Sequence, residues 1–329
     1  MMPGLRVGVV GVGSLGVHHA RLLAGMEGVE IAGVYDSSPV RVAEVTSQLG
    51  VRDAGSLERL LDGIDACVIA VPTEAHEEVA VAALSRGIHV LVEKPIAPSL
   101  DAADRMLAVA ARNRAMVQIG HVERFNGALR ACEAYLEEPL FVESHRLAPF
   151  GPRGTDVAVV LDLMIHDLDL VLSLMKRAVT NVSAVGVPVL TGSPDIANAR
   201  LEFEHGGVAN LTASRISLER MRKIRFFQKS GYISLDLAAG TGEYLRLRGG
   251  VSFEPGVAFS ATRLDEIVEH VPLRSDGQEP LRVELERFVA AVRGDAPVAV
   301  TGEEGRRALA VALEIVNRID RYVAARSLA

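Results

Sequence analysis

The chain is poor in cysteine and lysine, and it has neither an excess of positive charge nor a long apolar run. Cys67 and Cys132 are its two cysteines, in no CxxC arrangement, so we expect no disulfide framework and a reducing, cytoplasmic location. The formal net charge of -7 argues against a nucleic-acid binder. Since no apolar stretch reaches the ~20 residues of a membrane span and the first residues lack a signal-peptide core, we expect no membrane partner.

What is present is an ordinary globular composition, with 49% hydrophobic and 23% charged residues. A length of 329 residues predicts about two domains. Residues 1–121 alternate strand and helix patterns, which predicts a parallel sheet covered on both faces. Residues 122–329 carry successive strand patterns separated by turn residues, which predicts an open, mainly antiparallel sheet with helices on one face.

The expected elements follow from these patterns. In the first domain we expect strands at 5–10, 29–35, 66–71, 89–92 and 115–119, and helices at 14–23, 39–49, 57–61, 75–86 and 100–113. In the second we expect helices at 123–136, 158–175, 282–293 and 303–325, and strands at 140–147, 182–189, 196–204, 208–216, 223–228, 232–237 and 244–248.

A glycine-rich motif, GVGSLG at 11–16, joins the first strand to the first helix. Such a turn needs glycine for chain reversal, for close approach of a pyrophosphate and for helix packing, and it predicts a dinucleotide site. The second strand ends at Asp36, about 20 residues on, where an acid would accept hydrogen bonds from the adenosine ribose. An incidental glycine turn is the alternative. The predicted cofactor-binding residues here are Gly11, Gly13, Ser14, Leu15, Gly16 and Asp36.

The segments that follow the other strands should lie on the same rim, beyond the carboxyl ends of the parallel strands. Lys94, in Glu93-Lys94-Pro95, is one of four lysines in the chain. A lysine beside a nicotinamide can stabilise a substrate oxygen that becomes a carbonyl or alkoxide; a surface pair with Glu93 is the alternative. We add to the predicted cofactor-binding residues Pro72, Thr73, His76, Glu93, Lys94 and His121.

The apolar helix expected at 158–175 carries a polar stripe. Helical spacing places Asp162, His166, Asp169 and Ser173 on one face, whereas Asp167 departs from it. Histidine suits proton transfer near neutral pH, and a carboxylate one turn earlier can fix its tautomer. A solvated face, a satisfied interior pair or half of a metal site are the alternatives, and no third metal ligand is evident.

Taken together, the glycine motif, Asp36, EKP at 93–95, Asp162, His166 and the closing GDAPVAVTGEEGRRAL resemble the Gfo/Idh/MocA oxidoreductases over nearly the whole chain. The resemblance implies a Rossmann domain, residues 1–121, followed by a substrate-binding and oligomerisation domain, residues 122–329, whose sheet mediates homodimers or homotetramers. It also implies a catalytic lysine at Lys94, an Asp and His pair at Asp162 and His166, and in many relatives a cis peptide before Pro95.

Within that family, residues 120–126 and 146–167 are similar to bacterial UDP-N-acetylglucosamine 3-dehydrogenases. This implies NAD-dependent oxidation of a sugar-nucleotide ring hydroxyl, at C3, with Lys94, Asp162 and His166 catalytic and no metal. Asp36 favours NAD over NADP, although Arg41 lies nearby. The alternatives are a dehydrogenase of a free sugar or polyol such as inositol, and a non-catalytic NAD-binding sensor.

A nucleotide sugar also carries a diphosphate, which arginine binds well. Three arginines lie on segments that border the expected cleft, and ordinary surface arginines are the alternative reading for each. The predicted substrate-binding residues are Lys94, Arg124, Arg146, Arg153, Asp162 and His166.

Overall fold

The computed structural model describes residues 4–151, 157–249 and 267–327 and divides into two compact units. Unit 1 comprises Met1–Val122 and Glu279–Ala310, and unit 2 comprises Glu123–Gln278 and Val311–Ala329. The first division therefore falls next to the predicted boundary after residue 121. The segment Glu279–Ala310 differs from the prediction, because it returns to unit 1 and adds apolar side chains to that unit's core.

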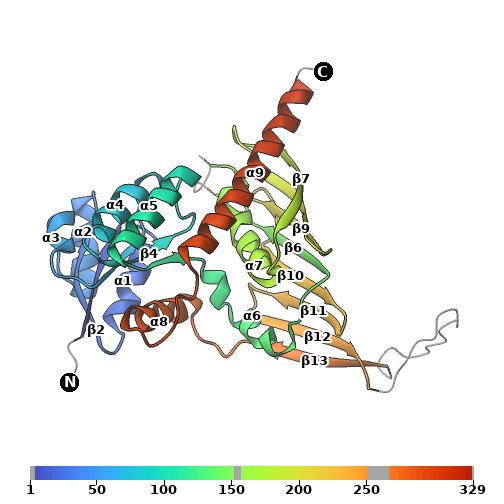
Figure 1. Cartoon of the computed structure of the whole chain (residues 1–329), viewed down its shortest axis with the longest axis horizontal. Helices are drawn as coiled ribbons and strands as arrows, with labels where there is room; N and C mark the ends of the chain where they lie inside the picture. The colour runs from blue at the N-terminus through green and yellow to red at the C-terminus, as the bar shows by residue number, and fades with distance from the viewer. Residues whose placement is uncertain (1–3, 152–156, 250–266, 328–329) are drawn as a thin grey trace, which may run out of the picture. The chain divides into compact units, whose positions relative to one another are not determined.

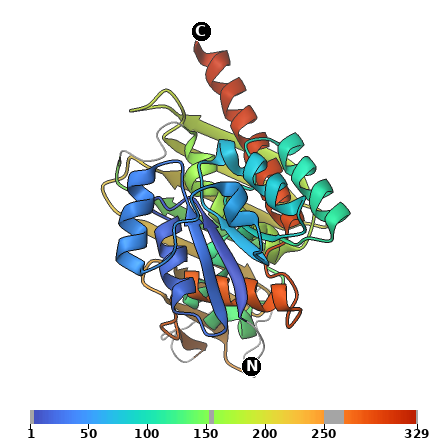
Figure 2. The ribbon, with the colours of Figure 1, turned by 90° about the vertical axis from the view of Figure 1, so that its left-hand side faces the viewer.

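Unit 1 is built on the predicted parallel sheet, with strand order β2-β1-β3-β4-β5. Its central strands are apolar on both faces, so they need cover on both sides. Figure 2 shows the blue and cyan strands between helices on either side. The strands are β1 (Leu5–Val10), β2 (Val29–Tyr35), β3 (Ala66–Ile69), β4 (His89–Glu93) and β5 (Val117–Gly120).

The helices of unit 1 form two layers. One layer packs apolar side chains of α1, α2 and α8 against Val7 and Val9 of β1. On the opposite side of β1, Gly8 approaches Leu60 of α3 so closely that a side-chain carbon would lie 3.0 Å from it. The helices are α1 (Gly16–Ala24), α2 (Pro39–Leu49), α3 (Leu57–Leu61), α4 (His76–Leu84), α5 (Leu100–Asn113) and α8 (Pro280–Arg293).

Unit 2 is built on an eight-stranded sheet, ordered β13-β12-β11-β10-β6-β9-β8-β7. Its neighbouring strands are antiparallel except for the parallel pair β6 and β9, which confirms the predicted sheet type. The edge strand β13 was not predicted. The strands are β6 (Phe141–Leu147), β7 (Val179–Val187), β8 (Ile196–Phe203), β9 (Val208–Ser214), β10 (Met221–Gln228), β11 (Gly231–Asp236), β12 (Thr241–Leu247) and β13 (Val268–Arg274).

The helices of unit 2 differ from the prediction in two places. The helix expected at 123–136 is broken into η2 (Val122–Phe125), α6 (Gly127–Cys132) and η3 (Glu133–Tyr135). The break occurs at Asn126, whose side chain accepts the Ala128 amide and caps α6. The helix expected at 158–175 begins as a π-helical turn, Val160–Met164, and continues as α7 (Ile165–Met175), which packs against β6 and β9 (Figure 1).

The last helix, α9 (Gly302–Ser327), contributes its first residues to unit 1 and the rest to unit 2. Across the described parts of the chain, no helix is both long and apolar enough to cross a membrane. In the same residues no group of three or more His, Cys, Asp or Glu side chains is placed to hold a metal ion.

Candidate functional site

The turn after β1 is shaped by its three glycines. Gly11 has a φ of +85°, and a side-chain carbon there would lie 2.6 Å from the Ala70 carbonyl oxygen. A side-chain carbon at Gly16 would lie 1.8 Å from the Gly11 carbonyl oxygen, so α1 can begin at this point only without one. At Gly13 a side-chain carbon would meet nothing within 4 Å, which leaves room for a diphosphate to approach the backbone. Ser14 and Leu15 are exposed beside it, and the turn fits a dinucleotide at the α1 N-terminus.

Asp36 is fixed beside this turn. Its Oδ2 accepts the Val12 amide at 2.8 Å, and its Oδ1 accepts the Ser38 amide at 2.9 Å. Arg41 reaches the same turn, because its guanidinium donates to the Val12 carbonyl oxygen at 3.0 Å and pairs with Glu44 at 2.5 Å. The carboxylate is therefore held where a ribose hydroxyl could donate to it, with one neutralised arginine nearby.

The carboxyl ends of β3, β4 and β5 bring more predicted residues to the same edge of the sheet, because these strands are parallel. Pro72 is exposed and precedes η1 (Thr73–Ala75), and Thr73 is half-buried. Lys94 is half-buried directly after β4, and the peptide that joins it to Pro95 is cis, as the resemblance implied. His121 is buried directly after β5.

Two of the predicted cofactor-binding residues have buried polar contacts within unit 1. The His76 ring is 1% exposed, and its nitrogens lie 3.0 Å from the carbonyl oxygens of Pro95 and Val71. Burial lowers the pKa of His76. Glu93 Oε1 lies 2.7 Å from Nε2 of His19, a buried residue of α1 that was not predicted to belong to the site. The only sequence signal for His19 was its position on the apolar side of the first helix.

In unit 2 the predicted proton-transfer pair lies where the helix changes type. Asp162 belongs to the π-helical turn and His166 to the first turn of α7, and both side chains are half-buried. π-helical turns within helices occur frequently at functional sites, because they change the direction in which side chains project. Asp169, which the spacing places on the same polar stripe, is buried.

The acidic residues of α7 hold two of the predicted substrate arginines. Arg124 Nε and Nη2 donate to Asp169 at 2.6 and 2.9 Å. Arg146, 3% exposed, donates to both Asp167 oxygens at 2.8 and 2.9 Å and to Glu123 at 2.8 Å. Burial lowers the pKa of Arg146, but the two carboxylates outweigh burial and raise it above its ordinary value. These contacts favour a structural role for Arg146.

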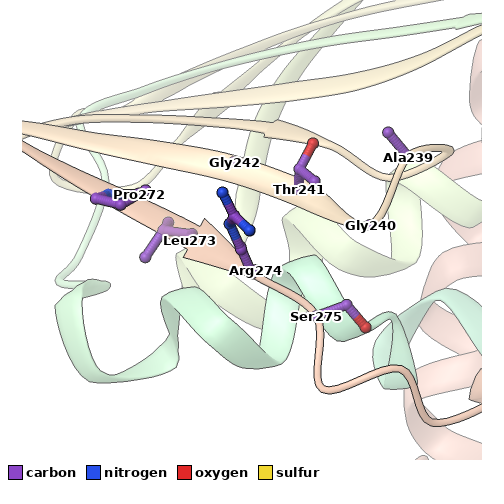
Figure 3. A pocket seen from close by; sticks show the side chains of 8 residues that line it. All are labelled: Ala239, Gly240, Thr241, Gly242, Pro272, Leu273, Arg274 and Ser275. Carbon is purple, nitrogen blue, oxygen red and sulfur yellow. The ribbon is translucent and has the colours of Figure 1, made fainter.

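The third predicted arginine, Arg153, lies outside the described residues. The roles of Asp167 and Glu123 were missed, and the only available signal was the presence of acidic residues in otherwise apolar segments. A separate hollow of about 440 Å³ opens between the β11–β12 turn and β13, beside Thr241, Arg274 and Ser275 (Figure 3). It contains none of the predicted site residues.

Comparison with known families agrees with this two-unit architecture. Residues 5–121 match the model described as the oxidoreductase family, NAD-binding Rossmann fold, and residues 124–234 match the GFO/IDH/MocA C-terminal domain. The chain is also 37% identical to UDP-N-acetylglucosamine 3-dehydrogenase of Acidithiobacillus ferrooxidans over 97% of its length and 98% of that enzyme. The chain belongs to the GFO/IDH/MocA oxidoreductase family. Its cofactor is NAD, which confirms the prediction from Gly11–Gly16.

Two further similarities bear on the family assignment. A solved structure of UDP-N-acetylglucosamine 3-dehydrogenase from Acidithiobacillus ferrooxidans superposes with a TM-score of 0.89 at 36% identity, covering 98% of this chain and 99% of that one. Inositol 2-dehydrogenase 2 of Saccharopolyspora erythraea is 28% identical over 94% of this chain and 91% of that enzyme. The family's members therefore include enzymes with different sugar or polyol substrates.

Proposed function

We propose that this oxidoreductase oxidises a ring hydroxyl, at C3, of a UDP-linked amino sugar such as UDP-N-acetylglucosamine. The observation that carries the proposal is the 37% identity, over nearly the full length of both chains, to an enzyme of that activity. The combination of Lys94, Asp162 and His166, which the family resemblance matches to catalytic residues, supports a catalytic protein over a sensor. A sensor has no need of proton-transfer groups.

The glycine turn and Asp36 would hold the dinucleotide. Gly13 leaves the backbone open to the diphosphate, and Asp36 accepts from the adenosine ribose. When bound, NAD supplies an acceptor for the hydride that leaves the sugar carbon. Asp36 also opposes a 2'-phosphate by charge repulsion, so NAD is preferred over NADP.

The proton and the developing charge are handled by the protein. His166 accepts the proton of the sugar hydroxyl, and Asp162 orients the imidazole. Lys94 supplies the positive charge that stabilises the substrate oxygen as it becomes a carbonyl. Arg124 and Arg153 remain the predicted ligands of the nucleotide diphosphate, whereas Arg146 is assigned to the buried pair with Asp167.

The decisive experiment is a substrate panel read by absorbance of the reduced cofactor. We expect NAD reduction with UDP-N-acetylglucosamine and a much lower rate with free N-acetylglucosamine, myo-inositol or NADP. Lys94→Met and His166→Ala should each lower kcat by about 100-fold or more while NAD affinity changes less than about twofold. A wild-type rate in either variant would remove that residue from the mechanism.

A free-polyol dehydrogenase is the second candidate, and the similarity to inositol 2-dehydrogenase 2 favours it. That enzyme class would reduce NAD with myo-inositol and gain nothing from a UDP group. Rates on the two substrates, compared at equal concentration, separate the candidates.

We also propose a homodimer or homotetramer assembled through the sheet of unit 2. The sheet has exposed apolar side chains at Val185, Phe227 and Leu247, which a second copy could cover. The mass from light scattering tests the proposal, because a monomer at all concentrations would contradict it.

The buried free thiols of Cys67 and Cys132 support a cytoplasmic location, which a fluorescent fusion would test.

A further inference from the structure

The residues on either side of Lys94 are each held by a buried histidine of unit 1. Glu93, before the lysine, is bonded to His19 of α1, which is 0% exposed. Pro95, after the lysine, offers its carbonyl oxygen to His76 at the start of α4, which is 1% exposed. The residues immediately before and after Lys94 are therefore both held in place by hydrogen bonds to buried histidines.

The Glu93 carboxylate links His19 to the lysine. Its Oε1 lies 2.7 Å from His19 Nε2, and the carboxylate also accepts a hydrogen bond from the Lys94 backbone amide. Burial raises the pKa of Glu93, but the hydrogen bond from His19, the charges of His19 and Lys94, and the Lys94 amide outweigh burial and hold the pKa below its ordinary value. Glu93 is therefore an ionised acceptor that joins a helix side chain to the lysine backbone.

The His19 ring is poised to donate from one nitrogen. An ionised carboxylate only accepts, so Nε2 must carry the proton that bonds Glu93. The other nitrogen, Nδ1, is buried and has no hydrogen-bond partner in the part of the chain that the structure describes. The bond from Nε2 to Glu93 therefore fixes the orientation of the buried ring.

Helix α1 therefore contacts both the dinucleotide turn and Glu93 through residues one helical turn apart. Its first residue, Gly16, closes against the dinucleotide turn, and His19 lies three residues further along the same helix. We propose that His19 is a positioning residue for Lys94, acting through Glu93, so that the helix that holds the cofactor diphosphate also fixes the catalytic lysine. The catalytic part of this inference rests on the proposed function; the positioning part does not.

The test compares His19→Met, which keeps the bulk and removes the donor, with His19→Gln, whose amide can donate from a similar position. Competitive amine labelling followed by mass spectrometry measures the reactivity of Lys94 against Lys176, Lys223 and Lys229 in the same sample. Loss of the His19 donor should loosen the segment Glu93–Pro95 and expose the half-buried Lys94. The relative labelling of Lys94 should therefore rise about threefold or more in His19→Met and stay near the wild-type level in His19→Gln.

Kinetics provide the second readout. A misplaced catalytic group raises the free energy of the transition state, so His19→Met should lower kcat about 10- to 100-fold. The KM values for NAD and for the sugar substrate should stay within about twofold of the wild-type values, and His19→Gln should restore most of the lost kcat. The control is His18→Leu, which alters the exposed neighbour on the same helix and should leave both readouts unchanged.

Each outcome decides the inference. A folded His19→Met protein with unchanged relative labelling of Lys94 would overturn it, as would equal loss in the Gln and Met variants. If His19→Met fails to fold, Glu93→Gln replaces it with the same expected rise in labelling, and its absence would overturn the inference. A wild-type protein that reduces no NAD with any panel substrate, yet shows the labelling response, would reject the proposed function and retain the positioning role.

Discussion

At the scale of single residues, the sequence is most informative about residues whose placement depends on their own short segment. Gly11, Gly16 and Asp36 follow from local spacing, because turn geometry and strand length place them. The partners of Arg146 could not be predicted in this way. Asp167 and Glu123 each lie more than 20 residues from it in the chain, and which acid meets which arginine depends on packing. The site assignments themselves stay predictions until they are tested.

Removing the Asp36 charge should weaken discrimination against NADP. In Asp36→Ser we expect the ratio of kcat/KM for NADP to that for NAD to rise about 10- to 100-fold. A change of this size corresponds to the free energy of one or two charge-assisted hydrogen bonds between the carboxylate and the ribose of NAD. Steady-state rates with each cofactor check this. Asp53→Ser is the matched control, because Asp53 is an exposed acid whose Oδ1 accepts the turn amide of Gly55. An unchanged ratio in Asp36→Ser would remove Asp36 from the cofactor site.

Arg146 should matter for stability, because it pairs with two buried carboxylates. Arg146→Met leaves two buried carboxylates without their cation, so the free energy of unfolding should fall by about 3–5 kcal/mol. Adding Asp167→Leu to this variant should restore part of the lost stability. Urea unfolding followed by circular dichroism measures both. Arg200→Met, at an exposed ion pair with Glu202, should change stability by less than about 0.5 kcal/mol. A stable, folded Arg146→Met protein with lost substrate binding would instead support the original substrate role.

At the scale of elements, the strands and helices with strong periodicity were predicted, and the misses have physical causes. The strand β13 contains Pro272, which lacks a backbone donor and so argues against a strand. The structure places it at the sheet edge, where that donor is not needed. The π-helical turn before α7 leaves no mark in the apolar pattern, because residues 158–175 are apolar around most of the helix.

The glycine turn gives a contrast between two substitutions in one element. Gly13→Ala adds a carbon where nothing lies within 4 Å, so stability should change by less than about 1 kcal/mol while NAD affinity falls about tenfold or more. Gly16→Ala places a carbon against the Gly11 carbonyl oxygen, so the turn must shift and both stability and NAD affinity should fall. Thermal unfolding and cofactor fluorescence measure the two effects. Wild-type NAD affinity in Gly13→Ala would contradict the assignment of the diphosphate to this turn.

At the scale of the whole molecule, the thiols should report global unfolding. Burial raises the pKa of Cys67 to about 12 and that of Cys132 to about 12, so neither forms a reactive thiolate at neutral pH. A thiol reagent should therefore react with neither until denaturant unfolds the chain, and then with both. Reagent absorbance against denaturant concentration, compared with circular dichroism, checks this. Reaction of one thiol before the other would identify the unit that opens first, since Cys67 belongs to unit 1 and Cys132 to unit 2.

The return of Glu279–Ala310 to unit 1 has a consequence for synthesis on the ribosome. The five strands of its sheet emerge first, but Leu285 and Phe288 of α8, which complete one face of their core, follow about 160 residues later. Until then the nascent sheet keeps apolar surface uncovered, and most of unit 2 is made in the interval. The dinucleotide-binding unit is thus the first to begin folding, and its core is completed only when α8 has been made.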